Sequence, residues 1–243
     1  MSGSSDSIAS RIEDVLARRE AAASRAGRHP LEIRMLAVTK GIPPAQVVQG
    51  ARAGLVAFGE NYVKEGLEKI SQVTESLGAK ADGVSWHFIG KLQRNKARLA
   101  VPAFELIHSV DTVPLAKEID QRAAARGITQ QILLEVNIVG EASKAGFTPD
   151  AVVAAARAID KMKHVRLSGL MTVPPLSDDP EDSRPHFRAL RELRDEIRRK
   201  GLANDSFRDL SMGMTGDFEV AIEEGATWIR VGTAIFGPRP VKK

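Results

Sequence analysis

One lysine in the sequence lies where an amine could react with an aldehyde. Lys40 follows the apolar run Ile33–Val38 and is separated from it only by Thr39. Apolar neighbours disfavour the charged ammonium group and lower its pKa, and a neutral lysine amine is a nucleophile toward carbonyl groups. The alternative is a lysine at the edge of a strand, whose aliphatic stem covers apolar surface while its ammonium stays in water. The other residues near Lys40 must decide between the two.

Polar residues also end several other short apolar runs. Asn61 comes just after the run 55–58, His87 lies within the run 86–89, and His108 and Glu135 lie near the ends of two later runs. Each could be a polar group that is hydrogen-bonded inside the protein, and we favour this interpretation for His108 and Glu135. For Asn61 and His87, a site role and a structural role are equally supported.

Two glycine-rich segments late in the sequence have the composition of a phosphate site, SMGMTGD (211–217) and RVGTAIFG (230–237). Glycines such as Gly213 and Gly232 let backbone N–H groups approach phosphate oxygens, and the hydroxyls of Ser211, Thr215 and Thr233 add donors. Alternatively, Thr215 only caps a helix and Gly232 only permits tight packing. Taken together, the residues favour a phosphate site.

Arg230 lies in the last apolar run, between Ile229 and Val231. Alternation along a strand points Arg230 inward if those two neighbours face helices. A guanidinium there would disfavour protonation of a nearby pyridine nitrogen, because like charges repel. The alternative is an interior arginine paired with Glu135 or Asp217.

The elements that must position these residues alternate along the chain. Helix-period stretches separate eight short apolar runs, each short enough for a buried strand. The runs are Ile33–Val38, Leu55–Phe58, Trp86–Ile89, Leu106–Val110, Ile132–Val136, Leu167–Met171, Asp209–Met212 and Trp228–Val231. The helix patterns include Phe187, Leu190, Leu193 and Ile197, and also Val63, Leu67 and Ile70, with start signals at Pro43-Pro44 and Thr148-Pro149.

This alternation predicts the α/β class and a (β/α)8 TIM barrel, because an open doubly wound sheet usually has five or six strands. We expect a single domain over residues 1–243, with an extra N-terminal helix at about Ser7 to Arg25 and flexible residues 1–6. Length alone would also allow two small domains. Active sites of such barrels lie at the C-terminal strand ends, and phosphate often binds after strands seven and eight. The loop Pro174–Pro185 after the sixth strand has the composition of a mobile lid.

Composition excludes several classes of protein. Hydrophobic residues make up 43% and charged residues 27%, as in soluble globular proteins, and no apolar run approaches the roughly 18 residues that span a bilayer. The first ten residues lack the pattern of a secretion signal and the chain has no cysteine, which favours a cytoplasmic location. The net charge of +4 comes from interleaved acidic and basic residues, so we expect neither nucleic-acid nor membrane partners.

With a lysine after the first strand and a phosphate cradle after the last two, the sequence resembles the pyridoxal phosphate homeostasis protein family, also called alanine-racemase N-terminal-domain-like proteins. The resemblance extends from about Ile33 to Arg239. Its motifs are AVTK (37–40), FGENYVKE (58–65), WHFIGKLQRNK (86–96), IHSVD (107–111), LSGLMTVPP (167–175), SMGMTGDFEVAI (211–222) and IRVGTAIFG (229–237). Thr215 and Thr39 stand where serine is common in the family, and both keep a hydroxyl.

The resemblance implies a cofactor and a set of residues that hold it. The cofactor is pyridoxal 5′-phosphate (PLP), bound as a Schiff base to Lys40, with Arg230 facing the pyridine nitrogen and no metal. Ser211, Gly232 and Thr233 would contact the phosphate, with Gly213 and Thr215 beside them. Asn61, His87 and Met171 would line the ring. We expect no catalytic residue, and transient contact with PLP-dependent enzymes is a further prediction.

Two other activities remain open at this stage. A PLP-dependent amino-acid racemase would use the same lysine, but related racemases take an opposing tyrosine from a second domain. This sequence ends at Lys243, soon after the eighth run, and its only tyrosine is Tyr62. We therefore prefer a protein that holds PLP without strong catalysis. A Schiff-base aldolase would place its lysine on a later strand and has no support from the motifs.

Overall fold

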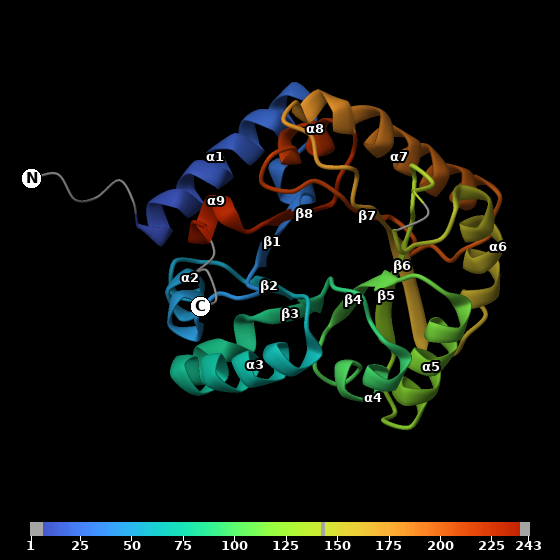
Figure 1. The fold of residues 1–243 in the computed structure, drawn as a ribbon, viewed down its shortest axis with the longest axis horizontal. Helices are drawn as coiled ribbons and strands as arrows, with labels where there is room; N and C mark the ends of the chain where they lie inside the picture. The colour runs from blue at the N-terminus through green and yellow to red at the C-terminus, as the bar shows by residue number, and fades with distance from the viewer. Residues whose placement is uncertain (1–6, 142–143, 239–243) are drawn as a thin grey trace, which may run out of the picture.

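The eight apolar runs form a closed barrel of parallel strands in the order β1 to β8 (Figure 1). The computed structural model describes residues 7–141 and 144–238, so the prediction for residues 1–6 lies outside the described residues. The strands are β1 (Arg34–Val38), β2 (Ala57–Glu60), β3 (Ser85–Phe88), β4 (Leu106–Val110), β5 (Gln130–Glu135), β6 (Val165–Met171), β7 (Asp209–Ser211) and β8 (Trp228–Val231). The predicted (β/α)8 barrel is therefore confirmed.

Helices surround the barrel and connect successive strands (Figure 1). The α-helices are α1 (Ile8–Arg25), α2 (Pro44–Arg52), α3 (Val63–Leu77), α4 (Ala97–Ala100), α5 (Val113–Ala124), α6 (Pro149–Ile159), α7 (Arg184–Arg199), α8 (Phe218–Glu223) and α9 (Thr233–Phe236). The 3-10 helices are η1 (Pro30–Glu32), η2 (Gly78–Gly83), η3 (Arg94–Lys96) and η4 (Pro180–Ser183). None of the helices in the described residues is long and apolar enough to cross a membrane.

Successive side chains along each strand point alternately into two hydrophobic regions. Ile229 and Val231 pack in the layer between strands and helices, whereas Trp228 lies inside the barrel. The interior cluster consists of Leu36, Ala57, Leu106, Leu133, Met171 and Trp228. Because side chains alternate along a strand, Arg230 shares the inward face with Trp228, as predicted.

Most helix signals in the sequence are confirmed. Ser7 caps α1 by accepting a hydrogen bond from the Ser10 N–H, and Thr148 caps α6 in the same way at Ala151. α2 begins at Pro44, as the pair of prolines predicted. The suggestion that Thr215 caps a helix is wrong, because Asp217 occupies the position before α8.

Helix α3 buries a face that the apolar spacing did not predict. Its buried residues are Val63, Gly66, Lys69 and Val73, while Leu67 and Ile70 are only half-buried. A Cβ on Gly66 would come within 2.8 Å of the Phe104 ring, so the helix lies very close to its neighbours at this point. The close contact at Gly66 and the buried partners of Lys69 together explain why these residues, and not Leu67 and Ile70, face the barrel.

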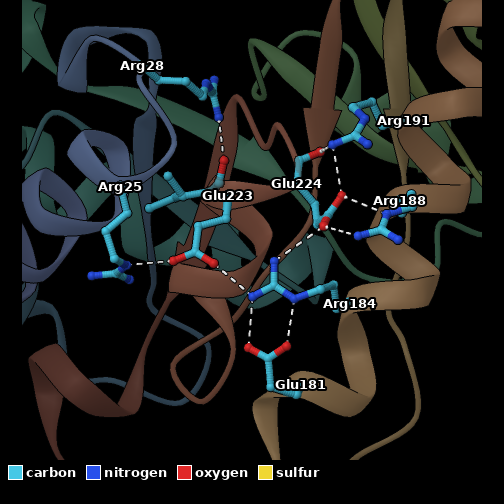
Figure 2. Close-up of polar contacts among 9 residues, drawn as sticks. Arg25, Arg28, Glu181, Arg184, Arg188, Arg191, Glu223 and Glu224 are labelled. Carbon is cyan, nitrogen blue, oxygen red and sulfur yellow. Dashed lines mark hydrogen bonds and ion pairs between the residues drawn. The ribbon is translucent and has the colours of Figure 1, made fainter.

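Helix α1 covers the place where β8 pairs with β1 and packs on α8 and α9 (Figure 1). A group of charged residues, the arginine–glutamate cluster, joins α1, η4, α7 and α8 (Figure 2). Glu224 accepts hydrogen bonds from Arg184, Arg188 and Arg191 at 2.8–3.3 Å. The other ion pairs of the cluster join Glu223 to Arg25 and Arg184, and Glu181 to Arg184. The cluster fixes the segment after the sixth strand to the outer helices.

Candidate functional site

A cavity of about 450 Å³ opens at the C-terminal ends of the strands. Six of the predicted site residues line it, namely Lys40, Asn61, Thr215, Arg230, Gly232 and Thr233. Apolar side chains of Val38, Ile89 and Met214 complete much of its wall. We call this the Lys40 cavity. Its size and mixed lining suit a small ligand with both a ring and polar groups.

The backbone around Lys40 rests on a buried group of charged residues, the Lys69 cluster, formed by Thr39, Glu60, Glu65 and Lys69. The Lys69 Nζ donates to Glu60 Oε1 at 2.6 Å and to the Thr39 carbonyl oxygen. The Thr39 hydroxyl donates to the same Glu60 oxygen at 2.6 Å. Lys69 and Glu60 are both buried, with side chains 4% and 0% exposed. Thr39, the residue before Lys40, is thus bound through its hydroxyl and its carbonyl oxygen to a buried ion pair.

Glu65 extends this support to the residue after Lys40. Its carboxylate accepts a hydrogen bond from the Gly41 N–H at 2.6 Å and lies 3.1 Å from the Lys69 Nζ. Gly41 has a φ of 70°, a conformation that favours glycine. Both neighbours of Lys40 are therefore fixed to α3, which limits the directions in which the Lys40 side chain can leave the backbone.

Burial raises the pKa of Glu60, although the hydrogen bonds from Lys69 and Thr39 act in the opposite direction. The second carboxylate oxygen, Oε2, is buried and has no hydrogen-bond partner among the described residues. An unpaired buried acceptor destabilises the charged form of a carboxylate. The ion pair therefore exists at an energetic cost.

Asn61 lines the cavity just after the end of β2, and its backbone lies very close to the segment after β3. A Cβ on Gly90 would come within 2.1 Å of the Asn61 carbonyl oxygen, so only glycine fits there. The Gly90 carbonyl in turn accepts a hydrogen bond from the Ser109 hydroxyl. The Asn61 Oδ1 is buried and lacks a hydrogen-bond partner among the described residues. It is an acceptor that a ligand in the cavity can satisfy.

Arg230 enters the cavity from β8 and is 4% exposed. Its Nη1 donates to the Ser211 hydroxyl at 2.7 Å and its Nη2 to the Thr172 carbonyl oxygen at 2.9 Å. Burial lowers the pKa of Arg230 to about 10, with Asp217 and Glu135 acting to raise it, so the guanidinium stays protonated at neutral pH. Neither Asp217 nor Glu135 is a hydrogen-bond partner, and Arg230 is held by neutral groups instead.

Two histidines continue this network below the cavity. The Ser211 hydroxyl lies 2.8 Å from the His108 Nδ1, and the His108 Nε2 lies 3.0 Å from the His87 Nδ1. His87 packs edge-on against the Trp228 ring, inside the barrel. Burial lowers the pKa of His87 to about 3 and that of His108 well below its usual range, so both rings are neutral. The chain of contacts positions Arg230 from beneath.

The loops after β7 and β8 supply the donors expected for an anion. Thr215 and Gly216 line the cavity from one loop, and Gly232 and Thr233 from the other. A Cβ on Gly232 would lie 3.3 Å from both the Cβ and the carbonyl oxygen of Val38, so the glycine also allows β8 to end close to β1. The close-packing interpretation of Gly232 is therefore supported, and its contact with a phosphate stays a prediction.

Asp217 fixes the loop after β7. Its Oδ1 accepts a hydrogen bond from the Met214 N–H at 2.6 Å, and its Oδ2 accepts one from the Ser183 hydroxyl at 3.0 Å. Ser183 ends η4, the 3-10 helix in the segment that we predicted to be a lid. The same segment contributes Pro175, Leu176 and Ser177 to the cavity wall. It lies at the mouth, as a lid must, and its mobility stays a prediction.

Four predicted site residues are not among those that line the cavity: His87, Met171, Ser211 and Gly213. His87, Met171 and Ser211 lie deeper in the barrel, with exposures of 1%, 1% and 0%. Gly213 packs against α8, where a Cβ would come within 2.5 Å of the Ala221 Cβ. Their contact with a ligand stays a prediction. Val173 and Leu176 also line the cavity. They were not predicted as site residues, although the motif 167–175 and the predicted lid contain them.

Comparison with known proteins shows which proteins this chain is similar to in sequence and in fold. Residues 18–240 match the sequence profile of the alanine racemase N-terminal domain. A pyridoxal phosphate homeostasis protein of Aquifex aeolicus is 43% identical over 94% of this chain and 97% of its own length. The protein of the same name from Escherichia coli is 37% identical over 97% of this chain and 98% of its own length.

Solved structures agree with the sequence comparison. PipY of Synechococcus elongatus, solved with PLP bound, has a TM-score of 0.78 and 34% identity, covering 90% of this chain and 100% of its own. An alanine racemase of Clostridium difficile has a TM-score of 0.67 at 14% identity, covering 94% of this chain and 58% of its own. The racemase shares the barrel fold.

Proposed function

Because this chain belongs to the family of the pyridoxal phosphate homeostasis proteins, we propose that it binds PLP in the Lys40 cavity as a Schiff base and takes part in intracellular PLP homeostasis. It acts as one (β/α)8 domain in the cytoplasm, with PLP as its ligand and transient contacts to PLP-dependent enzymes. The observation that carries the proposal is the presence of an amine, a buried guanidinium and two hydroxyl-bearing glycine loops in one cavity.

The residues fit the parts of this cofactor. The hydroxyls and backbone N–H groups of Thr215, Gly232 and Thr233 suit the phosphate, as do the barrel loops that carry them. The unpaired Asn61 Oδ1 offers a polar contact at the ring, and Ile89 and Met214 offer apolar ones. When bound, PLP supplies an aldehyde that combines reversibly with amines and a ring that accepts electrons.

Two residues set how the cofactor is held. Lys40 provides the amine for the covalent bond, and the Lys69 cluster fixes the backbone on either side of it. Arg230 stays positively charged and is already bound to Ser211 and Thr172, so it disfavours a proton on a ring nitrogen placed beside it. A ring without that proton is a weaker electron sink, which favours holding PLP over using it.

The surroundings of the cavity also favour weak catalysis. The single tyrosine of the sequence, Tyr62, is not among the residues that line the Lys40 cavity. His87 and His108 lie below Arg230 and stay neutral, with their ring nitrogens engaged within the barrel. General acid–base catalysis needs a group within reach of the proton that moves. We therefore propose that the protein is not an efficient racemase.

The test of PLP binding uses absorbance and chemical trapping. We expect the purified protein to bind PLP with the absorbance band of a protonated imine, and borohydride reduction followed by peptide mass spectrometry to place the pyridoxyl group on Lys40. Lys40→Ala should lose both signals, because the variant has no amine at that position. Lys161→Ala, at an exposed position, is the matched control. An unchanged band in Lys40→Ala would refute the assignment.

The test of catalysis follows solvent deuterium into the Cα position of alanine and other amino acids. Exchange detects proton removal even when no net product forms. We expect rates well below the roughly 1 s⁻¹ at the lower end of ordinary enzymes. A faster rate that depends on Lys40 would show that the protein is a racemase or a related enzyme.

A further inference from the structure

A second cavity, of about 460 Å³, lies beside the Lys40 cavity and shares only Asn61 with it. It is formed by the start of α3 and by the segment that leads from β3 through η3 into α4. We call it the Lys91 cavity. None of the roles described above uses its other residues.

The lining of the Lys91 cavity is strongly basic. Lys64, Lys91 and Lys96 contribute to it from three positions along the chain, and no carboxylate is among its lining residues. Lys64 is 92% exposed and reaches Glu68 only at 3.9 Å, a weak interaction in water. Glu65, a further acid of α3, is bound to Lys69 and to the Gly41 N–H. Glu135 interacts electrostatically with Lys91 from outside the lining. Three lysines at one hollow give it a positive potential, which attracts an anion.

The same cavity has an aromatic and apolar wall. Tyr62 is 65% exposed and is the single tyrosine of the sequence. Phe88 and Val63, both buried, form part of the cavity wall. An exposed tyrosine ring next to lysines is a surface on which a planar ring can stack while its charged substituents meet the ammonium groups.

The backbone adds to the attraction for anions. Tyr62 precedes the first residue of α3 and makes no side-chain hydrogen bond to the N–H groups of the first turn. A helix of 15 residues has a partial positive charge at this end. It therefore acts in the same direction as the three lysines.

We propose that the Lys91 cavity binds a free nucleotide, a molecule that joins a planar base to two or more phosphate groups. The phosphates lie among Lys64, Lys91 and Lys96, and the base stacks on Tyr62. Base and phosphate together explain why aromatic and basic residues share one hollow, which an inorganic anion alone would not need. This inference is independent of what the Lys40 cavity binds.

The experiment measures the binding of four probes by calorimetry at physiological salt, with and without added PLP. The probes are ADP, pyrophosphate, adenosine and a ten-nucleotide single-stranded RNA. We expect ADP to bind at least tenfold more tightly than either pyrophosphate or adenosine, because each of these lacks one half of the ligand. The RNA arm tests whether the same chemistry belongs to nucleic acid, and binding more than tenfold tighter than ADP would overturn the proposal.

Variants assign the binding to residues. Tyr62→Ala should weaken ADP about tenfold and leave pyrophosphate unchanged, whereas Lys91→Gln and Lys96→Gln should weaken both. Lys161→Gln is the control for the loss of one positive charge at an exposed site. The proposal is overturned if ADP binds no better than pyrophosphate, if Tyr62→Ala has no effect on ADP, or if ADP displaces PLP and so occupies the Lys40 cavity.

Discussion

The arginine–glutamate cluster joins outer helices to one another, and the Lys69 cluster joins α3 to the ends of β1 and β2. The two clusters differ in their access to water. At Glu224, a carboxylate that is 5% exposed meets arginines that are 26–53% exposed. At Glu60, both partners are buried. The hydrogen bonds of Arg188 and Arg184 hold the pKa of Glu224 below its usual range despite burial, whereas burial raises the pKa of Glu60 despite Lys69.

The opposite directions of these pKa shifts indicate different contributions to stability. A carboxylate with a lowered pKa stabilises the folded protein above the pKa of the unfolded chain and loses that contribution as the pH falls. Glu60 behaves in the reverse way. The protein's free energy of unfolding is not reduced by Glu60 below about pH 4.5, and it declines as the pH rises through the pKa that Glu60 has in the folded protein. We infer that the Lys69 cluster serves the position of Lys40 more than the stability of the fold.

The largest effect should come from Lys69→Met, which leaves Glu60 buried without its cation. Removal of one partner of a buried pair costs about 3–5 kcal/mol of unfolding free energy. The cost should shrink at pH 5 relative to pH 8, because Glu60 can then take up a proton. Urea unfolding at both pH values measures this difference.

The double variant Glu60→Gln/Lys69→Met separates stability from position. It removes both charges, so we expect it to regain most of the unfolding free energy that Lys69→Met loses. We expect both variants to retain PLP less well than the parent protein, because the backbone around Lys40 is no longer held. Lys64→Met, at an exposed position of the same helix, should change stability by no more than about 0.5 kcal/mol. Normal PLP retention in the double variant would contradict the positioning role.

A smaller effect is expected for Glu224→Gln, which removes the negative charge shared by three arginines (Figure 2). The loss should be about 2 kcal/mol, between the values for exposed and for buried ion pairs, because the arginines keep part of their hydration. Urea unfolding at neutral pH tests it, with Glu192→Gln on the exposed side of α7 as control. Equal stability of the two variants would show that the cluster contributes nothing.

The two buried histidines add a pH dependence of their own. The pKa of His87 is about 3 and that of His108 is also low, so the unfolded chain takes up protons below about pH 6.5 that the folded protein does not. The unfolding free energy should fall with decreasing pH, by up to about 1.4 kcal/mol per unit for each histidine. Urea unfolding between pH 7 and 5 measures the slope. His87→Asn should reduce it, and a flat profile in the parent protein would contradict the neutral pair.

The fold was predictable because strands and helices carry separate periodicities. β4 and β8 have the predicted bounds, and the helix with Phe187, Leu190, Leu193 and Ile197 buries all four. The Lys69 cluster was not predictable, because burial of Lys69 depends on Glu60 and on the Thr39 carbonyl, which approach it only in the folded barrel. Apolar spacing alone placed Leu67 and Ile70 on the buried face instead.

Within the site, the sequence predicted which strand ends carry site residues. It did not predict which inward-facing layer of side chains reaches the cavity. Successive inward residues of a strand lie two positions apart, so His87 is one layer below Ile89, and Met171 one layer below Val173. Ile89 and Val173 line the Lys40 cavity, and the residues below them do not. Which layer reaches the mouth depends on the stagger between neighbouring strands, and no single strand encodes that stagger.

The pairing of β1 with β8 has a consequence for how the chain matures. Arg34 lies opposite Trp228, so the sheet cannot close until β8 has left the ribosome. During synthesis β1 keeps an open edge, which is available for wrong pairing with other chains. α1 meets the same delay, because its ion pairs from Arg18 and Arg25 go to Glu219 and Glu223. Closure of the barrel is therefore expected to wait for the synthesis of β8 and to be the step at which chaperones matter most.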